Sequence, residues 1–276
     1  MLERKVSDMP VKSFLLFAIV IFAICISVSY ALVVQELNRL WMVKIHSDPS
    51  MPELFWAVTN LGGDAFVVLL VLLMAERRSG NVTSWIFKTW LTGALVAQVI
   101  KNLFPTPRPG FVLAIDQLNL IDNPPVLSGS MPSGHALAAI SCGLILCTML
   151  VMNSKRLVWT LPVMLLSLVV AWSRVAVGAH WPADVFAGVG LAFLIVPATW
   201  IWEQQHSWNK WFQQRAGIGF LILIHFMIVV HLTFLPTEFL SVQLVQFSLC
   251  ALAGAKIFLL FRKYFFGSFN RLEISQ

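Results

Sequence analysis

The chain has 276 residues, of which 58% are hydrophobic and 12% are charged, whereas soluble domains average about 45–50% apolar and about 25% charged residues. This composition excludes an ordinary soluble domain and a disordered tail, and four cysteines in so long a chain exclude a secreted disulfide scaffold. The net charge of +6 does not indicate a nucleic-acid partner, because the basic residues lie at the ends of apolar runs, where they report membrane topology.

The first predicted element is a transmembrane helix over residues 14–34. No charged residue occurs in this stretch, and at about 1.5 Å per residue it crosses the roughly 30 Å hydrocarbon layer. A cleaved signal peptide is the competing interpretation. It would have an apolar core of about 7–15 residues followed by a small-residue cleavage site, and residues 30–40 offer no good one.

Seven further apolar runs follow, at residues 65–75, 89–100, 136–152, 157–172, 185–202, 216–235 and 239–255. The predicted fold is therefore an all-α, polytopic transmembrane helix bundle with about eight spans. The second and third runs are short, and we expect Asp64 and a snorkelling Lys88 to extend them. The predicted parts are an N-terminal helix and outer loop (1–54), a core (55–202) and two additional helices with a tail (203–276).

Basic residues are distributed unequally between the two sides that eight alternating helices define. Thirteen lie on the side of the N-terminus and five on the other side, and Lys256, at the end of the last run, is left out of both counts. Because cytoplasmic loops carry the excess of Lys and Arg, both termini are predicted to be cytoplasmic. The five outer residues are Arg39, Lys44, Lys101, Arg108 and Arg174.

Three of these outer basic residues belong to polar segments at helix ends. Lys101 ends the third run, and Arg108 follows in a proline-rich stretch that cannot continue a helix. The other segments are Pro132-Ser133-Gly134-His135, which opens the fourth run, Ser173-Arg174, which ends the fifth, and His180 with Asp184, which precede the sixth. The alternation of helices places all of these segments on one outer face.

Such a group of cations, imidazoles and a carboxylate is costly near a membrane unless it is paired, and a phosphate would satisfy it. Arginine offers a planar fork to phosphate oxygens and lysine a point charge. Ser133 and Gly134 are expected to present backbone N–H groups at a helix N-terminus, where the dipole also favours an anion. The predicted phosphate-binding residues are Lys101, Arg108, Ser133, Gly134 and Arg174.

Two histidines in this group indicate a reaction rather than binding alone. His180 and Asp184 are four residues apart, so the carboxylate can hold one ring N–H and leave the other nitrogen free to attack phosphorus. His135 is the expected general acid. No cofactor and no metal is expected, because Asp184 is the one carboxylate in these segments and the cations already supply positive charge.

The three segments resemble the signature of the type 2 phosphatidic-acid phosphatase superfamily of integral membrane lipid phosphatases. That signature is Lys, six residues, Arg-Pro; then Pro-Ser-Gly-His; then Ser-Arg, five residues, His, three residues, Asp, and every spacing is met here. The resemblance covers about residues 55–202 and implies a phosphohistidine on His180, oriented by Asp184, with His135 as the general acid. The two helices that follow exceed the six-helix plan of a small bacterial member.

The sequence thus predicts a membrane phosphatase that removes a terminal phosphate from a lipid phosphate or diphosphate in the bilayer, on the periplasmic face of a bacterial inner membrane. By resemblance, candidate substrates are undecaprenyl diphosphate, phosphatidylglycerol phosphate, phosphatidic acid and the lipid A 1-phosphate. Two alternatives stay open. One is a phosphotransferase that passes the phosphate from the histidine to a lipid, and the other is a lipid-phosphate carrier, although no internal repeat supports a carrier.

The remaining polar residues receive structural interpretations. Asp64 is expected to cap the second helix, and the loop with Asp116 and Asp122 is expected to shape the entrance to the site. His225 and His231 lie inside the seventh run, where we expect neutral, hydrogen-bonded helix packing. The two other histidines outside the motifs, His46 and His206, are expected to be solvated loop residues.

Overall fold

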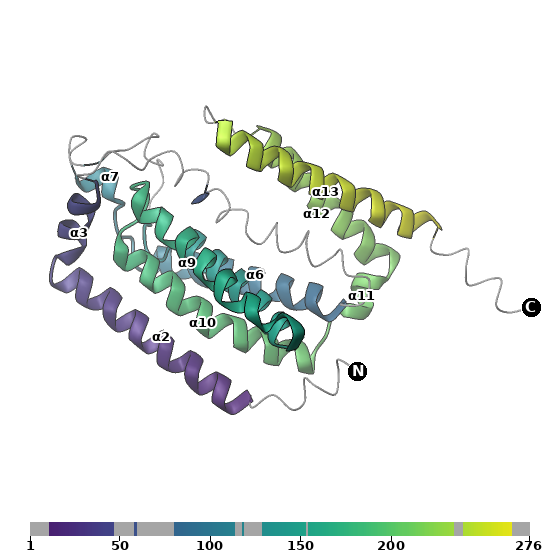
Figure 1. Ribbon diagram of the computed structural model, residues 1–276, viewed down its shortest axis with the longest axis horizontal. Coiled ribbons are helices and arrows are strands. Elements are labelled where there is room, and N and C mark those ends of the chain that lie inside the picture. Colours follow the sequence, from purple (N-terminus) through teal and green to yellow (C-terminus); the bar gives the residue numbers. More distant parts are fainter. Residues whose placement is uncertain are drawn as a thin grey trace, which may run out of the picture. The chain divides into compact units, whose positions relative to one another are not determined.

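The computed structural model describes residues 11–46, 58–59, 80–113, 118, 129–152, 154–234 and 240–266, and within these it contains helices and no strand (Figure 1). The predicted all-α class is therefore confirmed. Contacts divide the chain into two compact units, unit 1 with residues 1–66 and 89–201, and unit 2 with residues 67–88 and 202–276. The predicted three-part division after residues 54 and 202 remains a prediction.

The described helices of unit 1 include one long, central helix, α10 (Pro182–Gln205). The others are α2 (Val11–Val34), α3 (Leu37–His46), α6 (Gly80–Leu103), α7 (Pro109–Val112), α8 (Gly134–Met152), the 3-10 turn η2 (Ser154–Trp159) and α9 (Thr160–Ala176). The N-terminal part of α6 and the C-terminal end of α10 belong to unit 2. Unit 2 also contains α11 (Asn209–Gln213), α12 (Arg215–Phe234) and α13 (Leu240–Phe266).

Six helices among the described residues are long and apolar enough to cross a membrane. They are α2, α8, α9, α10, α12 and α13, and they correspond to six of the eight predicted runs. The third run lies in α6, which has 24 residues but is not apolar enough to be included with them. The second predicted run, with Asp64, lies outside the described residues.

Three helices differ clearly in extent from the apolar runs that predict them. α13 continues to Phe266, beyond the predicted end at residue 255. α6 begins at Gly80 rather than near residue 89, because uncharged polar residues continue a helix without adding to its hydropathy. α9 begins only at Thr160, after the 3-10 turn η2. Pro162 suits the first turn of α9, where its missing N–H leaves no hydrogen bond unmade.

The central helix of unit 1 is α10. Of its most apolar stretch 67% is buried, against 22% for α2 and for α9. Two glycines allow neighbours to approach it closely: a Cβ at Gly188 would lie 2.6 Å from the carbonyl oxygen of Ser133, and a Cβ at Gly190 would lie 2.9 Å from the Cβ of Cys25. α10 is thus held from both sides, whereas α2 and α9 keep broad apolar faces for lipid.

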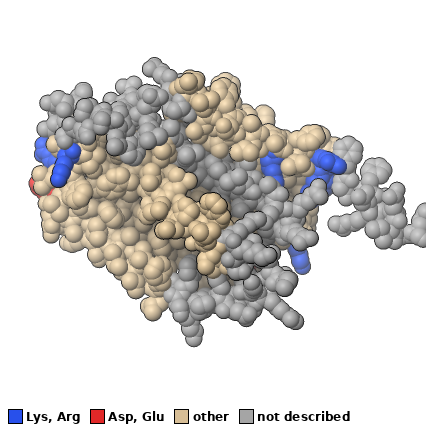
Figure 2. Space-filling view, in the orientation of Figure 1, with Lys and Arg blue, Asp and Glu red and all other residues tan. Residues whose placement is uncertain are grey.

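Charged side chains are unevenly distributed over the surface of unit 1. On the face that Figure 2 shows, they gather at the end near α3, and the flank around α2 has none. Most of the exposed side chains of α2 are apolar, and they include Leu16, Phe17, Ile19, Ile24 and Val33. This separation is typical of a helix that faces hydrocarbon and ends at a membrane–water interface.

Lys88 in unit 2 does not snorkel, contrary to the sequence-based expectation, because it is fully buried. Its Nζ donates to Glu203 Oε2 at 2.7 Å and to the backbone carbonyl of His206. The same Nζ lies 4.9 Å from the ring centroids of Trp202 and Trp208. The expectation was wrong because a carboxylate, a carbonyl and two indole faces replace the water that the ammonium group would otherwise seek.

The last two spans of unit 2, α12 and α13, pack against each other. His225 in α12 is buried, and its Nδ1–H donates to the carbonyl of Leu221 at 2.7 Å. This arrangement agrees with the predicted role in helix packing. His231 is exposed on the same helix, so the expected packing role is wrong for this residue. The side chain of His206 is exposed as expected.

Candidate active site

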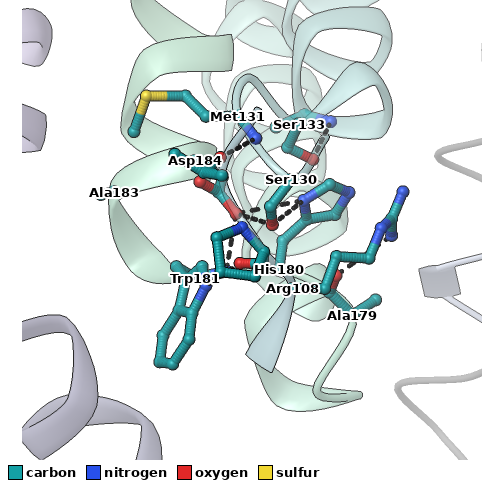
Figure 3. A network of polar contacts seen from close by, with 12 residues as sticks. Arg108, Ser130, Met131, Ser133, Ala179, His180, Trp181, Ala183 and Asp184 are labelled. Atoms are coloured by element: carbon teal, nitrogen blue, oxygen red, sulfur yellow. Dashed lines mark hydrogen bonds and ion pairs between the residues drawn. The ribbon is translucent and has the colours of Figure 1, made fainter. Parts of the chain in front are cut away.

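The structure places all eight predicted site residues at the ends of unit 1 helices and in the segments that join them. Lys101 ends α6, Arg108 precedes α7, Ser133 precedes α8, Gly134 and His135 begin α8, Arg174 lies near the end of α9, His180 stands before α10, and Asp184 lies in its first turn. Four of these residues, Arg108, Ser133, His180 and Asp184, are seen together in Figure 3. Residues that are up to 83 positions apart, from Lys101 to Asp184, therefore form one site.

His180 is held by its own loop and by the helix that follows. Its backbone N–H donates to the carbonyl of Arg174 at 3.1 Å, which closes the turn after α9. This turn requires a positive φ of 74° at Gly178, a conformation that glycine adopts without strain. The ring Nδ1 lies 3.3 Å from Asp184 Oδ2, and the same oxygen accepts the backbone N–H of Trp181 at 2.9 Å.

The surroundings of His180 favour a neutral imidazole. Burial lowers its pKa well below the usual histidine value, and the positive charges of Arg174, Arg108 and Lys101 lower it further. A neutral ring has one nitrogen with a free electron pair. Because Asp184 is an acceptor beside Nδ1, the proton belongs on Nδ1 and the electron pair on Nε2.

The N-terminus of α8 is built differently from the expectation. Ser133 is an N-cap, since its Oγ accepts the N–H of Ala136 at 3.3 Å. Its own backbone N–H donates to the carbonyl of Asp184 at 2.9 Å, so it is not free to bind phosphate as expected. The N–H groups of Gly134 and His135 remain as first-turn donors, and a Cβ at Gly134 would meet nothing within 4 Å.

Three cations, Lys101, Arg108 and Arg174, lie near this helix end and form no ion pair with a carboxylate in the part of the chain that the structure describes. Among the described residues the ion pairs are Lys88 with Glu203 and His180 with Asp184. Burial lowers the pKa of Lys101, and the neighbouring charge of Arg108 lowers it further. The Nε atoms of Arg108 and Arg174 are buried and have no hydrogen-bond partner in the part of the chain that is described. A bound dianion would relieve both the repulsion and the unmade hydrogen bonds.

Each arginine is fixed by a neutral oxygen that leaves its charge uncompensated. Arg108 Nη1 donates to the carbonyl of Ala179 at 3.2 Å, beside His180. Arg174 Nη1 donates to Thr59 Oγ1 at 2.8 Å, and Ser173 Oγ donates to the same hydroxyl at 2.9 Å. The guanidinium groups are thus positioned but not neutralised, as an anion-binding site requires.

His135 occupies the second position of α8 and is half-buried. Arg174 and His180 lie near enough to influence its ionisation. This placement, at the start of α8 and near His180, would suit a residue that exchanges a proton with the leaving group.

Sequence reasoning missed three hydroxyl residues of the site: Ser130, Thr106 and Thr59. Ser130 Oγ donates to Asp184 Oδ2 and lies 3.5 Å from His180 Nδ1. The backbone N–H of Ser130 donates to the carbonyl of Thr106 at 2.8 Å, and the hydroxyl of Thr106 accepts the N–H of Met131 at 3.1 Å. The one signal in the sequence is their nearness to the predicted segments, which does not distinguish them from other hydroxyl residues.

One side chain from α2 and one from α3 hold the N-terminal end of α10. Asn38 Oδ1 accepts the N–H of Ala183 at 3.0 Å, and Ser29 Oγ donates to the carbonyl of Ala183 at 2.9 Å. The expectation that His46 is a solvated loop residue was wrong. It ends α3 in a buried position, because its Nε2 lies 3.0 Å from the carbonyl of Val175.

The carboxylates that sequence analysis placed outside the motifs, Asp64, Asp116 and Asp122, lie outside the described residues. Among the residues that the structure describes, no group of three or more His, Cys, Asp or Glu side chains forms a candidate metal site.

The comparisons with known proteins match the part of the chain that contains these segments. Residues 82–208 match the PAP2 superfamily. An undecaprenyl-diphosphatase from Sulfolobus acidocaldarius is 30% identical over 124 residues, which are 45% of this chain and 56% of that protein. The undecaprenyl-diphosphatase BcrC of Bacillus subtilis is 23% identical over 131 residues, which are 48% of this chain and 63% of that protein. The chain thus spans 56% and 63% of the lengths of these relatives.

A solved structure shares the fold. The transmembrane PAP2 type phosphatidylglycerolphosphate phosphatase from Bacillus subtilis superposes with a TM-score of 0.51 at 21% sequence identity. The superposition covers 72% of this chain and 98% of that one. At this identity the likeness concerns the fold alone.

Proposed function

Through residues 82–208 the chain belongs to the PAP2 superfamily, and on that basis we propose that it is a membrane lipid phosphatase. The observation on which this rests is the site itself. A buried, neutral His180 backed by Asp184 stands among three cations that form no ion pair with a carboxylate among the described residues. A nucleophile beside cationic groups that can bind phosphate is the arrangement that phosphoryl transfer to histidine requires.

The proposed substrate class is a lipid that ends in a phosphate or diphosphate. Both curated relatives are named undecaprenyl-diphosphatases, so undecaprenyl diphosphate is the first candidate. Phosphatidylglycerol phosphate, phosphatidic acid and lipid A 1-phosphate present the same terminal group to Lys101, Arg108 and Arg174. These lipids differ in the head group beyond the terminal phosphate, and this difference would determine which of them is the substrate.

In the first half of the proposed reaction, the electron pair of His180 Nε2 attacks the terminal phosphorus. The bond from phosphorus to the lipid-side oxygen breaks, and that oxygen keeps the bonding electrons and takes a proton from His135. Charge that develops on the phosphoryl oxygens is met by the guanidinium groups and by the first-turn N–H groups of α8.

In the second half, the now neutral His135 removes a proton from water. The water oxygen attacks phosphorus, and the phosphorus–nitrogen bond breaks with its electron pair returning to Nε2. Inorganic phosphate leaves, and His180 and His135 are back in their starting protonation states. Asp184 keeps the proton on Nδ1 throughout, so the imidazolium charge that forms during transfer is stabilised.

The test of the proposed function is phosphate release from a panel of the four lipid phosphates by the purified full chain in detergent. We expect release from at least one of them, unchanged by excess chelator, since the cations supply the charge that Mg²⁺ supplies in many phosphoryl transfers. Vanadate is expected to inhibit by occupying the phosphate site. Activity that chelator removes and Mg²⁺ restores would refute this mechanism, labelled phosphate appearing on lipid would indicate the phosphotransferase, and binding without release would indicate the carrier.

We further propose that the site faces the periplasmic side of a bacterial inner membrane, with both termini cytoplasmic. The excess of basic residues on the N-terminal side supports this orientation. Gln35 and Gln214 are both exposed, so a cysteine introduced at either site can react with a thiol reagent that reaches its side of the membrane, and the test uses intact cells. An impermeant thiol reagent is expected to label Gln35→Cys and not Gln214→Cys, above the background of the four native cysteines. Labelling of Gln214→Cys and not of Gln35→Cys would mean that the site faces the cytoplasm.

A further inference from the structure

We propose that Ser130 is a positioning residue that fixes the tautomer of His180, so that Nε2 is the nitrogen free to attack. This inference rests on the proposed function and deepens it. Ser130 lies outside the three sequence segments that predict the site, and it acts through His180 and Asp184 rather than on the substrate.

The geometry places one hydroxyl between two catalytic side chains. Ser130 is fully buried, its Oγ donates to Asp184 Oδ2, and the same Oγ lies 3.5 Å from His180 Nδ1 (Figure 3). His180 Nδ1 also lies 3.3 Å from Asp184 Oδ2. The two side chains and the hydroxyl therefore form a closed triangle of polar atoms.

The number of protons in this triangle determines the tautomer. A serine hydroxyl has one hydrogen and two acceptor electron pairs. Because that hydrogen is given to the Asp184 carboxylate, Ser130 faces His180 Nδ1 as an acceptor. Nδ1 thus meets two acceptors and no donor, and the ring proton is stable only there. Without the hydroxyl, the carboxylate alone would hold Nδ1 through one long contact.

The backbone around Ser130 is held independently of its hydroxyl. Its N–H donates to the carbonyl of Thr106 at 2.8 Å, and the next N–H, of Met131, donates to the Thr106 hydroxyl at 3.1 Å. Removal of the Ser130 Oγ should therefore leave the segment in place. This separation makes Ser130→Ala a clean test of what the hydroxyl does.

Ser130→Ala is expected to lower kcat about 10- to 100-fold, the usual scale for one hydrogen bond to a charged group. KM is expected to change little, since the hydrogen bonds of Ser130 among the described residues go to Asp184, His180 and Thr106 and not to the phosphate-binding residues. The acid limb of kcat/KM should move to higher pH, because a buried carboxylate without its hydroxyl donor takes up a proton more readily. The titratable and charged groups around His180 are Lys101, Arg108, His135, Arg174 and Asp184, and all are intact in the variant.

The matched control is Ser141→Ala in α8. Ser141 is also buried in unit 1, and its Oγ has no hydrogen-bond partner among the described residues, so its loss should leave kcat, KM and the pH profile unchanged. In an Asp184→Asn background, adding Ser130→Ala should lower kcat little further, because Ser130 acts through the Asp184 carboxylate. An equal loss in both backgrounds, or a loss that appears in KM alone, would overturn the proposal.

A measurement on the unaltered protein makes the proposal independent of how the variants fold. In ¹⁵N-histidine-labelled protein, the His180 signals are those that disappear in His180→Gln, and we expect a protonated Nδ1 and an unprotonated Nε2. A proton on Nε2 would overturn the proposal. The same measurement on Ser130→Ala should show the loss of this single tautomer, and an unchanged tautomer would also overturn the proposal. If the tautomer depends on Ser130 but the protein releases no phosphate from any lipid, the proposed function fails and the assignment of Ser130 stands.

Discussion

Replacing His180 with alanine is expected to lower phosphate release by on the order of 10⁴-fold or more, because the nucleophile is lost while the binding groups remain. The labelled phosphoenzyme should disappear altogether. The measurement is a rapid quench after mixing with substrate labelled in its terminal phosphate, in alkaline detergent because the phosphorus–nitrogen bond of phosphohistidine hydrolyses in acid. Label retained on the His180→Ala protein would remove His180 as the nucleophile.

Two companion variants make this result specific. His206→Ala changes an exposed imidazole outside unit 1 and should leave labelling and turnover as they are. His135→Ala should slow both half-reactions by about 10²- to 10⁴-fold, the range for general acid–base catalysis, while His180 still becomes labelled. Loss of label in His135→Ala but not in His180→Ala would exchange the two roles.

The pH dependence of labelling should reflect the surroundings of His180. Burial and three neighbouring cations lower its pKa below the ordinary histidine value of about 6.5. The imidazole of His180 therefore loses its proton at a lower pH than an ordinary histidine does. The histidine limb of kcat/KM, which reports the free enzyme, should therefore lie on the acid side of that value. The second ionisation of the substrate phosphate, near pH 6, also changes kcat/KM with pH. It is measured separately on the substrate, and its contribution is removed from the pH profile.

Replacing Arg174 with alanine is expected to lower turnover about 10²- to 10³-fold, the scale for losing one charge-stabilising donor in a transition state. Arg174 is nearly buried, is fixed by Thr59 at 2.8 Å, and keeps a partnerless Nε in the described part of the chain. The variant should also lose sensitivity to vanadate. Steady-state kinetics and a vanadate titration measure both effects.

Two further variants separate position from charge. Arg174→Lys keeps the charge but not the planar fork, so it should recover only part of the activity. Arg39→Ala removes an exposed cation of α3, and as a surface change it should alter turnover by no more than about 2- to 3-fold. Equal losses in Arg174→Ala and Arg39→Ala would mean that general electrostatic attraction, rather than a fixed donor, accounts for the role of Arg174.

The amino-acid sequence by itself determined the helical membrane class and the segments of the site. A membrane-spanning helix must be apolar over about 20 consecutive residues, because its backbone polar groups bond within the segment and its side chains face lipid. That requirement is local, and it is visible in α2 and in the other spans. The segments around Lys101, Ser133 and His180 were equally visible in the sequence. Within each segment the motif residues lie only a few positions apart, near the end of a single helix, so their spacing is a local property.

Only the tertiary structure decided which further side chains meet these segments. Ser130 reaches Asp184 across 54 residues, Thr59 reaches Arg174 across 115, and Lys88 finds Glu203 across 115. In the sequence, Ser130 is one hydroxyl residue among many, and Lys88 reads as a membrane anchor. A buried hydrogen bond or ion pair depends on how helices pack, and the packing follows from contacts such as Gly188 against Ser133, which no local pattern of residues reveals.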